Sequence, residues 1–227
     1  NANPPVEGAG VRMMWYPEKA AFRVGAVDDG TILGQPGYCI TCPNNWDRDS
    51  IGSFSFASGY NSKASGIYST AFNNSTASGT GSTAMGHAGN ASGYTSTVMG
   101  VYTVAKAVTS LSIGSFNDNN DNPNPNFLDW QDRIFQIGNG TKDNARSNAI
   151  TVLRNGNTGI GTVNPAAKLH VADSAVLFTG SPTILNVGTN YNQAPPAEGV
   201  GTRMMWYPVR GAFRSGFVNG LQWNKDS

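Results

Sequence analysis

The chain has 227 residues, of which only 13 % are charged, and its formal net charge is +1. This composition excludes a nucleic-acid-binding domain, which needs a basic patch, and a disordered acidic tail. No stretch approaches the roughly 20 consecutive apolar residues of a membrane-spanning helix, and no signal peptide is recognisable. Because the chain begins with Asn1 instead of Met, we expect a mature product or an excerpt of a longer polypeptide.

Residues 1–45 predict a lead segment, a β-hairpin and an insertion. The two hairpin strands are expected at residues 12–16 and 21–25, with a bend at residues 17–20 between them. The alternating apolar residues and the proline at the bend are typical of this arrangement.

The insertion that follows the hairpin holds both cysteines of the chain, Cys39 and Cys42. A zinc site would need four ligands, and the chain adds only His87 and His170. A redox Cys-x-x-Cys motif belongs before a helix in a βαβ unit, which the sequence lacks. We predict a local disulfide between Cys39 and Cys42, as expected of an extracellular fibre, with free or interchain thiols as the alternative.

Residues 46–116 carry the phrase Ser-x-Ala-x-Gly-x-x, which recurs every seven residues with one step of six. In an extended strand the Ser, Ala and Gly of each phrase share one face, because side chains alternate. The opposite face carries a bulky apolar residue only in every second phrase, which gives the file Phe72, Met85, Met99 and Ile113. The repeat unit is therefore one coil of about 14 residues with two strands and two corners.

The expected fold is all-β, a parallel β-roll or β-solenoid flanked by β-hairpin modules. Glycine is expected at the corners because it tolerates the backbone dihedrals of a tight bend. The corner glycines include Gly66, Gly86, Gly93 and Gly100.

Three copies of the repeated phrase are similar to segments of a known protein family. They are Ser-Thr-Ala-Met-Gly at 82–86, Ser-Thr-Val-Met-Gly at 96–100 and Ser-Leu-Ser-Ile-Gly at 110–114. They resemble the head repeats of trimeric autotransporter adhesins, which implies a left-handed parallel β-roll with three chains side by side. Two downstream segments, residues 132–141 and 155–171, are similar to segments of phage tail fibres and of large bacterial surface fibres.

We also expect a homotrimer, intertwined or side by side, because one thin roll cannot cover its bulky file as well as Trp15, Trp46 and Trp130. The sequence leaves open which file faces inward. Threefold packing would bring the Ser/Ala/Gly faces together while the bulky file fills each coil.

Residues 117–191 predict a polar loop and a β-rich neck or connector. We expect the loop to be solvated, and a calcium site through Asp118 and Asp121 is the weaker alternative. Strands are expected at residues 133–137, 149–154, 166–171 and 175–179, with a turn at 155–157.

The sequence gives little indication of an enzyme, and we predict no catalytic, cofactor-binding or metal site. Asp129 and Asp132 are the only tempting carboxylate pair, and their spacing would place them on opposite faces of a strand. One file of threonines without a flanking second file is a poor match to an ice-binding surface. Its members are Thr70, Thr83 and Thr97.

Two short motifs, at Ser50 and Ser174, resemble O-glycosylation signals of some bacteria that secrete surface proteins. In each motif the serine follows an aspartate and precedes an apolar residue. Glycosylation at Ser50 and Ser174 is a hypothesis that rests on these three-residue matches alone.

Residues 192–227 predict the start of a next tandem module, a copy of residues 1–50. Residues 192–218 repeat residues 1–27, and Trp223–Ser227 repeats Trp46–Ser50. Modules of about 180 residues in a longer polypeptide explain a copy this close. The alternative is a pair of capping hairpins at the two ends of a finished protein.

The predicted function is that of a structural and adhesive segment, a rigid spacer or head, in a trimeric extracellular fibre on a bacterial surface. The alternative is a receptor-binding tail fibre of a phage or of a contractile injection system. Expected partners are two further copies, neighbouring modules, and a surface receptor or glycan whose identity the sequence does not give. No cofactor, nucleic acid or membrane span is expected in this segment.

Overall fold

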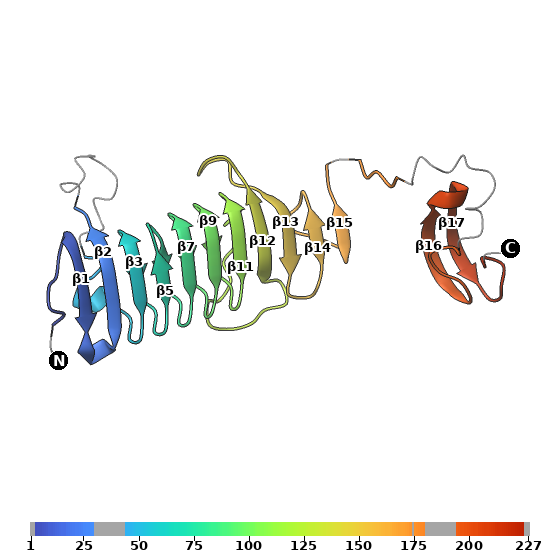
Figure 1. Ribbon diagram of the computed structural model, residues 1–227. Helices are drawn as coiled ribbons and strands as arrows, with labels where there is room; N and C mark the ends of the chain where they lie inside the picture. The colour runs from blue at the N-terminus through green and yellow to red at the C-terminus, as the bar shows by residue number, and fades with distance from the viewer. Residues whose placement is uncertain (1–2, 30–43, 174, 180–193, 225–227) are drawn as a thin grey trace. The chain divides into compact units, whose positions relative to one another are not determined.

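The computed structural model describes residues 3–29, 44–173, 175–179 and 194–224 (Figure 1). The chain divides into two compact units, Asn1–Asp173 and Ser174–Ser227, and each is described by itself. All regular structure in the described residues is β-strand, apart from three short 3-10 turns: η1 (Pro17–Lys19), η2 (Arg48–Ser50) and η4 (Pro208–Arg210). The predicted all-β class is therefore confirmed.

The first unit is built on one sheet of 11 strands, which lie side by side from β1 to β15 (Figure 1). It opens with the predicted hairpin, in which β1 (Gly10–Tyr16) pairs antiparallel with β2 (Ala21–Val27). Strand β2 then pairs in parallel with β3 (Phe56–Tyr60), the first strand of the repeat region. The hairpin is thus a continuation of the same sheet.

The repeat region alternates between two parallel sheets, so each coil contributes one strand to each. The larger sheet receives β3, β5 (Thr70–Phe72), β7 (Thr83–His87), β9 (Thr97–Val101) and β11 (Leu111–Ser115). The second sheet has four strands: β4 (Lys63–Ala64), β6 (Thr76–Ala77), β8 (Asn90–Ala91) and β10 (Val104–Ala105). Ala71 pairs with Ala57 of the preceding coil and with Ala84 of the following one, which confirms the β-solenoid and the predicted length of its coil.

The interior of the roll is filled by small side chains. Each coil places one residue from each sheet in a single fully buried cluster, formed by Ala57, Ala64, Ala71, Ala77, Ala84, Ala91, Val98 and Ala105. Buried serines line the corners, and the Ser69 hydroxyl, for example, donates to the Gly66 carbonyl at 2.6 Å. The arrangement in which the bulky file fills each coil is therefore wrong, because two sheets this close leave room only for small residues.

The glycines of the repeat serve close stacking more than corner geometry. A Cβ added at Gly66 would lie 2.1 Å from the Gly79 carbonyl oxygen, and one at Gly93 would lie 2.1 Å from that of Ala107, although neither glycine has a positive φ. Gly86 and Gly100 do have positive φ, +114° and +133°, and lie equally close to the next coil. Several left-handed corners hold other residues instead: Phe54, Tyr68, Thr95 and Thr109.

Polar side chains close the N-terminal end of the narrow interior. Arg23 of β2 occupies the file of the buried alanines, opposite Ala57. Its guanidinium is fully buried and donates to the Ser55 hydroxyl at 2.7 Å and to the Ala64 carbonyl at 2.9 Å. Because burial removes water from this cation, it lowers the pKa of Arg23 to about 10.

A cluster of buried amides closes the other end. The Asn148 amide donates to the Gln136 side-chain oxygen at 2.9 Å and to the Thr151 hydroxyl at 3.0 Å. Asn117 accepts a bond from the Val104 backbone N–H at 2.7 Å, which ties the cluster to the last coil. Solenoids need such caps because their terminal coils have a neighbour on one side only.

Four strands complete the first unit: β12 (Arg133–Asn139), β13 (Asn148–Leu153), β14 (Thr158–Ile160) and β15 (Leu169–Val171). Strand β12 pairs in parallel with β11, and β13 returns antiparallel. The strands expected at 133–137 and 149–154 and the turn at 155–157 are present, whereas only residues 169–171 of the strand expected at 166–171 form one. The strand expected at 175–179 is wrong, since no paired strand in the described residues offers it a hydrogen-bond ladder.

The second unit contains one hairpin, in which β16 (Gly201–Tyr207) pairs antiparallel with β17 (Ala212–Val218). Its register repeats that of the first hairpin, with Trp206 opposite Phe213 as Trp15 is opposite Phe22. The two copies in the sequence therefore fold alike.

The close stacking predicts a sharp difference between two nearby glycines. Gly79→Ala places a Cβ 2.1 Å from the Gly93 carbonyl oxygen and should lower the free energy of unfolding by about 3 kcal/mol. Gly81→Asn, at a corner where Tyr68 and Thr95 of the adjacent coils adopt the same left-handed backbone, should cost about 1 kcal/mol or less. Urea unfolding of both variants measures this, and equal losses of stability would contradict the stacking argument.

Candidate interaction surface

The outward face of the 11-stranded sheet carries one file that is apolar on every strand except β3, where Ser58 stands. Because side chains alternate along every strand, the residues opposite the buried alanines point away from the interior. The strand registers align the predicted bulky file with one residue from each of the remaining strands of the sheet. In strand order this file, here called the outward stripe, consists of Met13, Val24, Ser58, Phe72, Met85, Met99, Ile113, Ile137, Ile150, Ile160 and Val171.

The outward stripe is apolar yet open to solvent in the single chain. Met13 is 72 % exposed, and Met99 and Ile160 are 42 % and 43 % exposed. The four predicted bulky residues Phe72, Met85, Met99 and Ile113 all belong to the stripe. The eight members of the stripe other than Met13, Met99 and Ile160 are partly buried. A long, solvent-accessible apolar strip of this kind marks an association site.

A second file flanks the stripe and includes the threonines noted in the sequence. Thr70, Thr83 and Thr97 occupy its middle, between the aromatic residues Phe22 and Phe56 on one side and Leu111 and Phe135 on the other. The Phe22 and Phe56 rings stack with centroids 5.7 Å apart. The threonines thus lie in one file with these apolar residues, next to the outward stripe.

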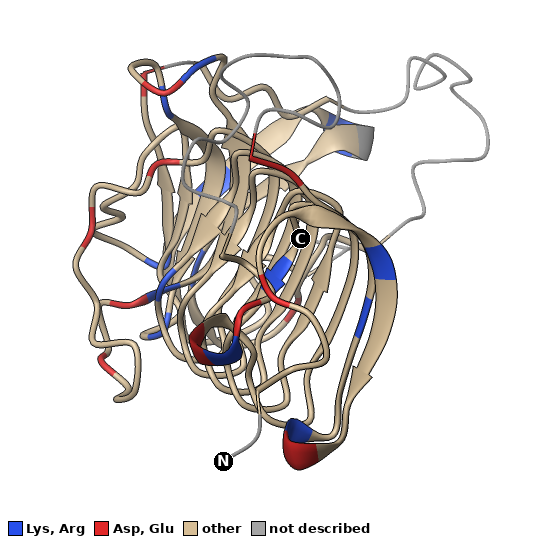
Figure 2. Cartoon of the chain, turned by 90° about the vertical axis from the view of Figure 1, so that its left-hand side faces the viewer, with Lys and Arg blue, Asp and Glu red and all other residues tan. Residues whose placement is uncertain are grey.

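Charged residues avoid both files. Figure 2 shows Lys, Arg, Asp and Glu as scattered segments, largely on turns and loops, while most of the strands carry no charge. The stripe itself contains no charged side chain, so covering it removes no ion from water.

The polar excursion after the roll, residues 117–131, is tied to the roll at several points, while residues 124–131 are exposed, as expected of a solvated loop. Asp118 lies 2.5 Å from Arg133, and Asp121 lies 3.5 Å from Lys106. Each carboxylate proposed for calcium therefore has a protein cation beside it. In the part of the chain that the structure describes, no group of three or more His, Cys, Asp or Glu could hold a metal ion.

Lys106 makes three polar contacts between the roll and the excursion. Its ammonium donates to the backbone carbonyls of Asn119 at 2.5 Å and Asp121 at 2.7 Å. On the same side, the Tyr94 backbone N–H donates to the Pro125 carbonyl at 2.8 Å. The excursion is thereby held against the coils of the roll.

Asp129 and Asp132 lie in a turn before β12, and the prediction that they occupy opposite faces of a strand is wrong. The Asp129 backbone N–H donates to an Asp132 carboxylate oxygen at 2.9 Å, and Arg154 lies 3.4 Å from the same oxygen. These contacts fix the turn and its attachment to β13.

The remaining candidate residues lie apart from one another. Ser50 is the last residue of η2 and is partly buried. His87 packs edge-on against Tyr102, with ring centroids 5.4 Å apart, on a different strand from His170. Cys39, Cys42 and Ser174 lie outside the described residues, so the disulfide and the glycosylation at Ser174 stay predictions.

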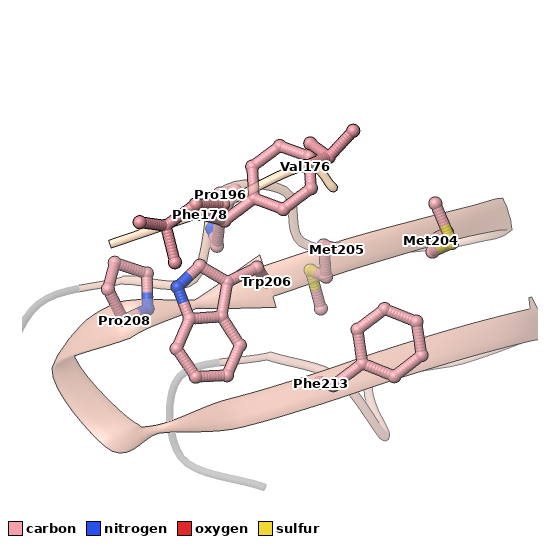
Figure 3. A pocket seen from close by; sticks show the side chains of 9 residues that line it. Val176, Phe178, Pro196, Met204, Met205, Trp206, Pro208 and Phe213 are labelled. Atoms are coloured by element: carbon pink, nitrogen blue, oxygen red, sulfur yellow. The ribbon is translucent and has the colours of Figure 1, made fainter. Parts of the chain in front are cut away.

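The hairpin of the second unit repeats the outward apolar face. Figure 3 shows Trp206 and Met204 of β16 and Phe213 of β17, with Val176 and Phe178 facing them. Together with neighbouring residues they line an open cavity of about 820 Å³. The apolar face is thus a property of both hairpin copies.

Sequence reasoning missed the extent of the stripe and the residues that close the roll. The alternation of Val11, Met13 and Trp15 in β1 would have extended the stripe, because these residues share one strand face. Arg23 gave no such signal, since its burial depends on carbonyl and hydroxyl groups that belong to distant parts of the sequence.

The geometry defines a β-solenoid with a small-residue interior and an apolar outward stripe, which is a structural rather than a catalytic architecture. Residues 50–72, 73–88 and 91–117 match the family model of the YadA head domain repeat. The β-roll is therefore built from adhesin head repeats, which makes it a component of an adhesin-type surface fibre.

A search of curated proteins and of solved structures found no match to this chain. The matched ranges end at residue 117, so the resemblance of the downstream segments to phage tail fibres stays a prediction. None of the described residues forms a helix long and apolar enough to cross a membrane.

Lys106→Ala should loosen the excursion without unfolding the roll. Loss of the three contacts of this ammonium should speed hydrogen exchange of the Tyr94 amide, which is bonded to Pro125, by about tenfold or more. Lys63→Ala, on the opposite edge strand of the four-stranded sheet, is the matched control and should leave this amide unchanged. Equal rates in the two variants would show that Lys106 does not hold the excursion.

Proposed function

We propose that this chain is a structural and adhesive segment, a rigid spacer or head, of a homotrimeric extracellular fibre on a bacterial surface. The observation that carries the proposal is the outward stripe, which runs through all 11 strands of the main sheet. The YadA head repeats of residues 50–117 support it, because they are the repeats of an adhesin head.

The thin interior explains why the chain needs partners. The roll buries alanines and serines, while its bulky apolar residues lie on the outside. A single layer of coils cannot cover both faces of its larger sheet. Three copies set side by side, with their stripes turned toward a common axis, would remove the stripes from water along the whole sheet.

The role of a rigid spacer follows from the stacking. Each inner coil is hydrogen-bonded to the coils on both sides, and polar side chains close both ends of the interior. Such a stack has no hinge within the roll, and added coils lengthen it in one direction only. The fibre can therefore hold an adhesive surface away from the cell.

The trimer is tested by placing charge on the stripe. In Met99→Asp/Ile113→Asp, association would bury two carboxylates per chain without partners, so the dissociation constant of the trimer should rise at least about 100-fold. Light scattering coupled to size exclusion should then give the mass of one chain instead of three.

The matched control, Ser78→Asp/Asn90→Asp, adds the same charge on the four-stranded sheet. Ser78 directly follows β6 and Asn90 lies in β8, and both residues are exposed. It should leave the mass of the assembly at three chains. A trimer that persists in the stripe variant, or an unmodified protein that is monomeric at all concentrations, would contradict the proposal.

A further inference from the structure

The second hairpin repeats the contacts of the first one by one. The Gly8 backbone N–H donates to the Asp47 carboxylate at 2.6 Å, and the corresponding Gly199 N–H donates to the Asn224 side chain at 2.8 Å. At the bend of each hairpin, an N–H donates at 3.1 Å to the carbonyl of Pro17 or Pro208.

The tryptophan that follows each hairpin is also placed alike. The Arg12 guanidinium lies over the Trp46 ring at 5.3 Å, and that of Arg203 lies over the Trp223 ring at 6.0 Å. Only residues 219–222 connect β17 to Trp223, whereas residues 28–45 connect β2 to Trp46. The placement of the tryptophan is therefore independent of the insertion.

The two hairpins differ in what lies beside the second strand. The outer edge of β2 is occupied by the first coil of the roll: the Phe22 N–H donates to the Ser55 carbonyl at 3.0 Å, and the Asn61 N–H donates to the Ala26 carbonyl at 2.8 Å. Arg23 enters the end of that coil. Among the described residues, β17 pairs with β16 alone.

The outer side of β17 is correspondingly more exposed. Phe213 is 63 % exposed and Phe217 is 69 % exposed, whereas Phe22 and Ala26, at the same positions of β2, are half-buried. Arg214 stands where Arg23 is fully buried, and it is itself only partly buried.

Gly216 of β17 corresponds to Gly25 of β2, but no neighbouring backbone in the described part of the second unit requires a glycine at this position. A Cβ at Gly25 of β2 would lie 2.2 Å from the carbonyl oxygen of Gly59 in the docked coil. At the corresponding Gly216, the nearest atoms belong to the Trp223 ring at 3.8 Å. In the first unit the Gly59 backbone leaves no room for a side chain at Gly25. Among the described residues of the second unit, no backbone lies in the corresponding place beside Gly216.

We propose that the outer edge of β17 binds the first coil of a β-roll joined directly after Ser227, in parallel and in the register of β2 with β3. In this complex the Phe213, Ser215 and Phe217 amides donate to the new strand, and Arg214 enters the end of the new roll. The inference goes beyond the proposed function, because it depends neither on the trimer nor on adhesion.

The lead-in residues favour an occupant on the same polypeptide. Trp223–Ser227 repeats Trp46–Ser50 in sequence, and in the first unit Trp46–Ser50 leads directly into the first coil through η2. The Trp46 indole N–H donates to the Ser62 carbonyl of that coil at 2.8 Å. A second copy of the chain is a poorer occupant, since the first coil of its roll is already covered by its own β2.

The test extends the whole chain by a second copy of residues 51–173, joined directly after Ser227. Hydrogen exchange is followed at the Phe213, Ser215 and Phe217 amides, which face away from β16. Docking should slow their exchange by about tenfold or more relative to the unextended chain. The Arg214 and Gly216 amides, which face β16, should be protected in both proteins and report that the hairpin is folded.

Arg214→Glu in the extended chain is the matched variant, because a carboxylate cannot donate to the carbonyl and hydroxyl groups at the end of the new roll. It should restore fast exchange at Phe213, Ser215 and Phe217 while the amides facing β16 stay protected. Unchanged exchange of β17 in the extended chain would overturn the proposal, whether or not the added roll folds. Protection in the unextended chain that grows with protein concentration would also overturn it, because the occupant would then be a second copy.

Discussion

The narrow gap between the two sheets of the roll is the constraint on which the structure depends. Coils stack so closely that a Cβ at Gly66 or Gly93 would collide with the next backbone, and the space inside each coil admits little more than alanine and serine. The methionines, isoleucine and phenylalanine of the bulky file are therefore excluded from the interior, where Val98 is the largest member of the buried cluster. The outward stripe is the direct consequence of this exclusion.

An alanine interior also limits what burial can contribute to stability. A buried methylene contributes about 0.8 kcal/mol, so coils that bury mainly methyl groups gain little from the hydrophobic effect. Backbone ladders between coils and the buried polar groups at both ends, such as Arg23 and Asn148, hold the roll together. The larger apolar gain is available only outside the roll, which couples the stability of the chain to its association.

Most of the fold could be predicted from the sequence, because the recurring Ser-x-Ala-x-Gly phrase encodes the coil directly. Which of the two files faces the interior could not be predicted. The alternation of side chains defines two faces of each strand, but it does not give the distance between the sheets. The burial of Arg23 depends on Ser55 and Ala64, which no local pattern connects to it. The strand expected at 175–179 failed for a related reason, because a strand is defined by its partner as much as by its own residues.

The most direct test of this account is the determination of the structure of the assembled chain, which locates the outward stripe relative to the neighbouring copies. The account predicts three copies around one axis, with Met85, Met99 and Ile113 of each buried between them. An assembly whose copies meet through the four-stranded sheet, with the stripe left in solvent, would contradict it.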